Sequence, residues 1–97
     1  MDFLTLNIYG DNDEIEKTYS TSHVRWKLFV DAVSINEQIA NESVEKQVSA
    51  VGQFMKSVFI GITDEELEKA DAFDIFNVFN AIVLKAQKMR GGNGKNA

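Results

Sequence analysis

Hydrophobic residues near the start of the chain recur at every second position. Leu4, Leu6 and Ile8 alternate with polar residues, and the same period returns between Ile15 and Tyr19. A period of two is typical of a strand with one buried face. Turn-forming residues at 10–13, Gly-Asp-Asn-Asp, separate the two runs. The pattern therefore predicts a β-hairpin over residues 3–19 with an acidic tip.

The period changes to 3.6 at about residue 22, which predicts a helix over residues 22–40. One apolar stripe, expected to face the core, consists of Val24, Leu28, Ala32, Ile35 and Ile39. A second stripe lies roughly opposite the first and consists of Trp26, Phe29, Val30 and Val33. This second stripe belongs to the core if the hairpin covers it. It belongs to a protein interface if the hairpin packs elsewhere, because aromatic anchors carry most of the energy in protein contacts.

Two further helices are predicted at residues 43–60 and 64–70. Residues 41–43 provide cap-forming side chains for the first of them. Its apolar stripe, expected to face the core, consists of Val44, Val48, Val51, Phe54, Met55, Val58 and Phe59. Gly61 stands where a glycine is expected after a helix. Thr63 and Glu66 have the spacing of a capping box, in which each side chain accepts a hydrogen bond from the backbone of the other.

The last predicted helix covers residues 72–89, with Asp71 as its N-cap and Gly91 beyond its end. Between residues 72 and 84 its only polar residues are Asp74, Asn77 and Asn80. A helix that is apolar around most of its circumference is either central in its own domain or buried against another chain. The candidate protein interface therefore also includes Phe73, Phe76, Phe79 and Leu84.

Together these elements predict an α+β fold, in which an N-terminal β-hairpin precedes a mainly helical domain of three to four helices. A chain of 97 residues supports one hydrophobic core, so we expect a single domain over residues 1–90. Residues 91–97 include three glycines and have no apolar side chain except the final alanine. We expect them to form a flexible tail.

The charge balance and the cysteine count narrow the function classes. With 15 acidic and 10 basic residues the chain repels phosphate backbones on average, so nucleic acid is not an expected partner. The absence of cysteine excludes disulfides and thiolate chemistry and suits a reducing compartment. Asp2 stands where a signal peptide would carry a basic residue, and no apolar run approaches the roughly 20 residues that span a bilayer. We expect a soluble cytosolic protein.

No arrangement of residues predicts catalysis. His23 is the only histidine, and it has neither a partner histidine nor a cysteine for metal binding or nucleophile activation. We expect it to lie in the first turn of the helix predicted at 22–40. The acidic run at 11–14 lacks the glycine and the final glutamate of a calcium-binding EF-hand loop. We therefore predict no catalytic residue, no metal, no cofactor and no small-molecule substrate, which leaves protein binding.

Several segments resemble one protein family in their order and composition. They are the hairpin from Leu4 to Tyr19, the helix with Trp26-Lys27-Leu28-Phe29, and the step Phe59-Ile60-Gly61-Ile62-Thr63-Asp64-Glu65-Glu66-Leu67, which Phe73-Asp74-Ile75-Phe76 follows. This arrangement resembles the tail assembly chaperones of long-tailed, siphovirus-type bacteriophages. The resemblance covers residues 3–90.

The resemblance implies a non-enzymatic protein that coats the hydrophobic tape measure protein until tail tube protein polymerises around it. It implies self-association, a location in the cytoplasm of the host bacterium, and absence from the mature virion. Such genes often also yield a longer product through a ribosomal frameshift, which would link the chain to tail tube protein. Gly94-Lys95-Asn96 can be encoded GGA AAA AAC, which contains a slippery heptamer; a GGG codon for glycine or an AAG codon for lysine would remove it.

Two other functions agree with the same residues. A head-to-tail connector of a phage would also be acidic, helical and self-associating, but would remain in mature particles. A small regulatory domain that binds a host protein is the alternative outside virion assembly.

Overall fold

Two strands precede four helices along the chain, and the computed structural model describes residues 4–91, with side chains placed through residue 88. The elements are β1 (Leu4–Tyr9), β2 (Ile15–Thr21), α1 (Trp26–Ile39), α2 (Val44–Val58), α3 (Asp64–Glu68) and α4 (Ala72–Gly91). The α+β prediction, a hairpin followed by helices, is confirmed. The tail predicted at 91–97 and the tripeptide at 94–96 lie outside the described residues, except Gly91, at which α4 ends.

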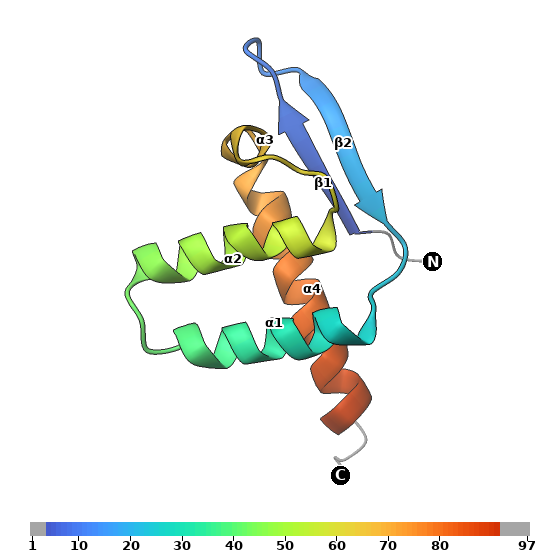
Figure 1. The fold of residues 1–97 in the computed structure, drawn as a ribbon, viewed down its shortest axis with the longest axis vertical. Helices are drawn as coiled ribbons and strands as arrows, with labels where there is room; N and C mark the ends of the chain where they lie inside the picture. The colour runs from blue at the N-terminus through green and yellow to red at the C-terminus, as the bar shows by residue number, and fades with distance from the viewer. Residues whose placement is uncertain (1–3, 92–97) are drawn as a thin grey trace.

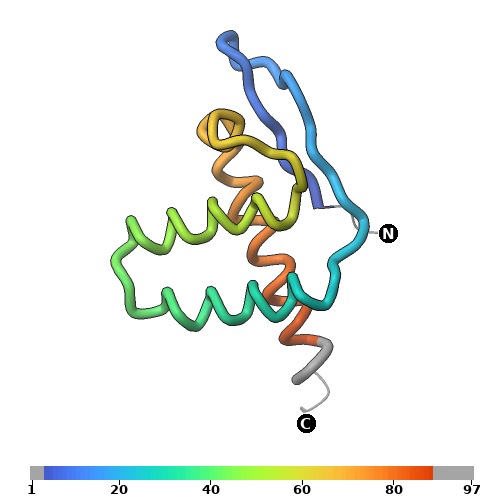
Figure 2. Tube along the Cα trace, in the orientation of Figure 1, coloured from blue at the N-terminus to red at the C-terminus, as the bar shows by residue number. Residues whose placement is uncertain are grey.

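Helices α1 and α2 lie side by side, and α4 crosses both of them (Figures 1 and 2). The turn that joins α1 to α2 extends beyond α4, so the N-terminal part of α2 has little to pack against. Val44 and Val48 lie in that part and are exposed, whereas both were predicted to face the core. Helix α4 contacts α1, α2 and β1, and is thus the central element of the molecule.

The core is one cluster that draws side chains from every element except β2 and α3. Its buried members are Leu6, Ile8, Leu28, Ala32, Val51, Phe54, Met55, Val58, Phe59, Ile62, Val78, Phe79, Ile82 and Val83. Phe54 of α2 and Phe79 of α4 meet edge to face, with ring centroids 5.8 Å apart. This geometry is favourable for aromatic pairs and adds to the benefit of burial. Leu28 and Ala32 confirm the predicted core stripe of the first helix.

Strand β1 has hydrogen-bond partners on both of its edges. One edge pairs with β2 in antiparallel register, and the other meets residues 69–71. The backbone N–H of Tyr9 donates to the carbonyl of Lys69 at 3.0 Å, and that of Asp71 donates to the carbonyl of Asn7 at 3.0 Å. The backbone N–H of Asn7 donates to the Asp74 carboxylate at 3.0 Å. The hairpin is therefore fixed to the start of α4 (Figure 1).

Most helix boundaries follow the predicted caps. Ser43 accepts a hydrogen bond from the backbone of Lys46, and the Thr63–Glu66 capping box is present. Asp71 accepts from the backbone N–H groups of Phe73 and Asp74 at 2.8 and 3.1 Å. These contacts satisfy donors that every helix N-terminus leaves free.

The start of α1 was predicted too early. The helix begins at Trp26, and β2 extends to Thr21, two residues beyond the predicted end of the hairpin. The hydroxyl of Thr21 accepts from the backbone N–H of His23 at 3.3 Å and donates to its carbonyl at 3.1 Å. This local turn competes with helical hydrogen bonding. His23 thus lies exposed before the helix and not in its first turn.

Candidate protein-binding groove between α1 and α4

An open apolar groove of about 580 Å³ runs between α1 and the C-terminal part of α4. Its residues from α1 are Trp26, Phe29, Val30, Val33, Ser34 and Glu37, and those from α4 are Ala86 and Gln87. All four residues of the second predicted stripe of α1 therefore meet in one groove. No described hairpin residue lines this groove; Trp26 and Val30 are exposed, whereas Phe29 and Val33 are half-buried.

Helical geometry explains why this stripe remains at the surface. Leu28 and Ala32 anchor α1 to the core, and the side chains of Trp26 and Val30 extend from the opposite side of the helix. Trp26 is 76% exposed and Val30 is 49% exposed. On the α4 side of the groove, Ala86 contributes only a methyl group. Apolar side chains that gather in one exposed patch are typical of a protein-binding surface.

The aromatic residues of the groove already have a defined geometry. The rings of Trp26 and Phe29 stand edge to face, with centroids 6.5 Å apart and an interplanar angle of 84°. Phe29 is half-buried and also lines a smaller pocket of about 330 Å³ that reaches Leu4 and Val24. Among the groove residues whose side chains the structure describes, Glu37 is the only charged one. The site suits apolar side chains, with one acidic group at its edge.

The other predicted interface residues do not join this groove. Phe73 and Leu84 are 81% and 56% exposed and do not line the groove. Phe76 is half-buried and lines a second pocket. Phe79 was wrongly assigned to the interface, because it is only 3% exposed and packs on Phe54 in the core. Ala86 and Gln87 were missed, since only the crossing of α4 over α1 brings them to Trp26.

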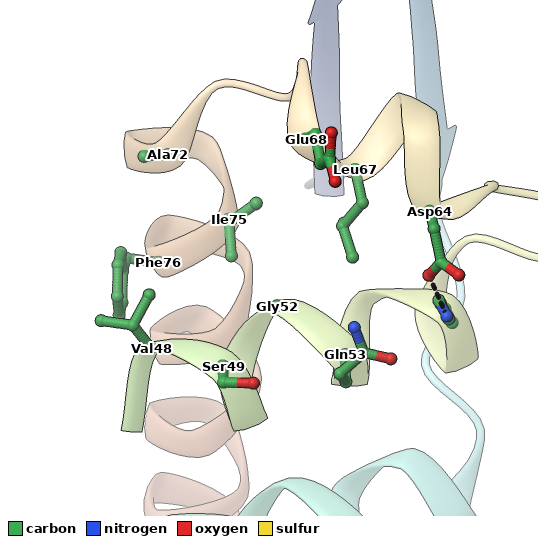
Figure 3. Close-up of a pocket in the computed structure, with 11 residues that line it drawn as sticks. Val48, Ser49, Gly52, Gln53, Asp64, Leu67, Glu68, Ala72, Ile75 and Phe76 are labelled. Carbon is green, nitrogen blue, oxygen red and sulfur yellow. Dashed lines mark ion pairs between the residues drawn. The ribbon is translucent and has the colours of Figure 1, made fainter. Parts of the chain in front are cut away.

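The second pocket lies between α2, α3 and α4 and has a volume of about 540 Å³ (Figure 3). Val48 of α2 and Phe76 of α4 lie near one another at one end. An ion pair between Lys56 and Asp64 closes the other end. Gly52 lies on α2 between these ends, where an added Cβ atom would meet no other atom within 4 Å. Among the described residues, more polar and charged side chains line this pocket than line the groove, and its one aromatic residue, Phe76, is half-buried.

Ionisable groups gather where the hairpin meets α3. The hydroxyl of Tyr19 donates to Glu66 at 2.5 Å, and Lys17 lies 3.2 Å from the other carboxylate oxygen. The hydrogen bond from Tyr19, and next the one from the backbone of Thr63, lower the pKa of Glu66 below its ordinary value of 4.5. Burial and the nearby Asp71 carboxylate raise the pKa of Tyr9. These groups hold elements together and do not point into the groove.

The described residues offer neither a cluster of metal ligands nor a membrane-spanning helix. Residues 4–88 contain no group of three or more histidine, cysteine, aspartate or glutamate side chains that could hold a metal ion. Among the helices described, none combines the length and the apolar character needed to cross a membrane. Comparisons with protein-family models, with curated proteins and with solved structures found no match. The site must therefore be interpreted from its own residues.

Proposed function

We propose that this chain is a non-enzymatic phage tail assembly chaperone, and that the groove between α1 and α4 binds an amphipathic helix of the tape measure protein. The observation that carries the proposal is the exposed aromatic groove around Trp26. A head-to-tail connector, the other virion-assembly function considered, is an outcome of the test below.

Helix-in-groove binding matches the shape and chemistry of this surface. A partner helix inserts apolar side chains three or four residues apart into a groove of this kind. Trp26 and Val30 are one helical turn apart on α1, so they can contact successive turns of the partner. Large aromatic side chains at the centre of such contacts usually provide most of the binding energy. Since the tape measure protein is a long hydrophobic helical chain, covering its apolar stripe would keep it in solution.

We infer the identity of the partner, the tape measure protein, from the resemblance to tail assembly chaperones. An N-terminal hairpin followed by helices, with apolar surface left exposed on two helices, agrees with what that resemblance implies. The proposal places the protein in the host bacterial cytoplasm, with tail tube protein as a second partner through a frameshifted product. The gene's codons for residues 94–96 test whether this frameshift site, and so the longer product, can exist.

Co-expression with the tape measure protein encoded downstream tests the function. We expect the tape measure protein to remain soluble with the wild-type chain and to precipitate without it. The double variant Trp26→Glu and Val30→Glu puts charge into the groove and should reduce the co-purified tape measure protein about tenfold or more. The double variant Val44→Glu and Ile60→Glu is the matched control, because it adds the same two charges at residues that are 74% and 72% exposed and lie outside the groove.

Two outcomes would overturn the proposal. One is a folded wild-type chain that neither binds nor solubilises the tape measure protein. The other is a stoichiometric amount of this chain in purified mature particles, which would favour a head-to-tail connector. Circular dichroism of each variant distinguishes lost binding from lost folding.

A further inference from the structure

The solvent face of α4 carries a second apolar feature, whose residues do not line the groove. Phe73, Asn77, Asn80 and Leu84 form one stripe along this face, with spacings of four, three and four residues. We call it the α4 stripe. All four residues are exposed, and its two ends are the large apolar side chains, at 81% and 56% exposure. The alternation of three and four residues is that of a coiled-coil seam.

The α4 stripe reads the same in both directions in terms of side-chain type: apolar, Asn, Asn, apolar. In an antiparallel pair of α4 helices related by a two-fold axis, Phe73 would lie opposite Leu84 of the second copy. Asn77 would then lie opposite Asn80 of the second copy, because Asn77 is four residues after Phe73 and Asn80 is four residues before Leu84. Each ring would meet an apolar side chain, and each amide would meet an amide that can both donate and accept. Such self-complementarity is what a two-fold interface between identical chains requires.

The charges along α4 also favour the antiparallel orientation. Asp71 and Asp74 lie at its N-terminal end, whereas Lys85 and Lys88 lie near its C-terminal end. When Phe73 lies opposite Leu84, Lys85 of one copy is level with residue 72 of the other. Measured along the helix axis, residue 72 is offset from each of the two aspartates by at most about 3 Å. A parallel pair would instead place aspartates beside aspartates and lysines beside lysines, which is unfavourable.

We propose that the α4 stripe binds a second copy of this chain, as an antiparallel α4–α4 pair with two-fold symmetry. The asparagines fix the register, because a shifted pair would place an amide against an apolar side chain. The stripe spans about 16 Å of helix, so the interface is small and the dimer dissociates on dilution. This inference does not rest on the proposed function, since it concerns the chain alone.

Sedimentation equilibrium of the purified full chain, from micromolar to near-millimolar concentration, tests the dimer. We expect one monomer–dimer equilibrium. Leu84→Glu should raise the dimer dissociation constant at least about tenfold, because the new carboxylate faces the phenyl ring of Phe73. Val44→Glu is the control of equal charge: Val44 is 74% exposed at the start of α2, and its substitution should leave the constant unchanged.

Cysteine cross-linking tests the orientation, because the chain contains no native cysteine. A mixture of Phe73→Cys and Leu84→Cys chains should form an oxidised heterodimer, while neither variant alone should cross-link efficiently. Cross-linking of each variant with itself would indicate a parallel pair and overturn the proposal. A wild-type chain that stays monomeric up to near-millimolar concentration would overturn it as well, as would equal effects of Leu84→Glu and Val44→Glu.

Discussion

At the scale of single residues, the carboxylate of Glu66 joins α3 to β2. It accepts from the backbone N–H of Thr63 at 3.1 Å and so completes the capping box of α3. It also accepts from Tyr19 and pairs with Lys17, both of which belong to β2. One carboxylate therefore couples the start of a helix to a strand almost fifty residues earlier in the sequence.

The ionisation of Glu66 should make stability depend on pH in the acidic range. Because its pKa in the folded chain is lowered from 4.5, mainly by the hydrogen bond from Tyr19, the folded state favours the charged form. Its contribution is complete above pH 4.5 and is lost as the pH falls below that value towards the lowered pKa. Glu66→Gln keeps the capping geometry but removes the charge. We expect the difference in unfolding free energy between wild type and variant to shrink as the pH falls through this range.

Urea denaturation of both chains across the acidic range measures that difference. Glu65→Gln removes a carboxylate from the same turn of α3, at an exposed position, and serves as the control. A difference between wild type and Glu66→Gln that stays constant with pH would show that the carboxylate contributes no charge-dependent stability.

At the scale of elements, local patterns predicted most of the fold. The two strands, the four helices and the caps at Ser43, Thr63 and Asp71 depend on residues close in sequence, so periodicity and capping chemistry were sufficient. The errors lie where local interactions compete, as at the start of α1, or where tertiary packing decides. The docking of the hairpin depends on the bond that the backbone N–H of Asn7 donates to Asp74 and on the one that its carbonyl accepts from Asp71, both more than sixty positions away. No local pattern contains that information.

The same limit explains the candidate site. The stripe with Trp26 was recognised from helical periodicity, but whether the hairpin covers it follows from where the hairpin docks. Phe79 and Phe73 both lie on α4 and are both phenylalanine, yet one is in the core and the other in solvent. A helix that is apolar on most sides gives no sequence signal for which side faces inward.

Replacing glycine by alanine should have opposite effects on the free energy of unfolding at Gly52 and Gly61. Gly52 lies within α2 and has open space around the position of a Cβ atom. Gly52→Ala should raise the free energy of unfolding by about 0.5–1 kcal/mol, because alanine loses less backbone entropy in a helix. Gly61 has a φ of 97° in the turn from Phe59 to Ile62. Gly61→Ala should lower stability by about 1 kcal/mol or more, since the methyl group disfavours that conformation.

Thermal or urea unfolding of the two variants beside wild type measures both effects in one experiment. A destabilising Gly52→Ala would mean that the space beside α2 in Figure 3 is filled in the folded chain. A neutral Gly61→Ala would mean that the turn before α3 has another accessible conformation.

At the scale of the whole molecule, the central helix contributes to two apolar surfaces that share no residue. Residues 86 and 87 of α4 complete the groove with α1, whereas the α4 stripe follows the face of α4 that turns away from the core. Helix α4 is thus covered on its core side by α1 and α2 and keeps apolar residues exposed on the other. A chain arranged in this way can pair with its own copy and still present the Trp26 groove to another protein.

Trp26 reports on the groove alone, because it is the only tryptophan in the chain and is 76% exposed. In the free chain we expect acrylamide to quench its fluorescence efficiently. In the purified complex with the tape measure protein the quenching constant should fall about threefold or more, since central aromatic anchors are desolvated on binding. Dimerisation through the α4 stripe should not protect Trp26. The free wild-type chain and Leu84→Glu should therefore give the same constant at every concentration, and a protection that grows with wild-type concentration would place the self-association in the groove instead.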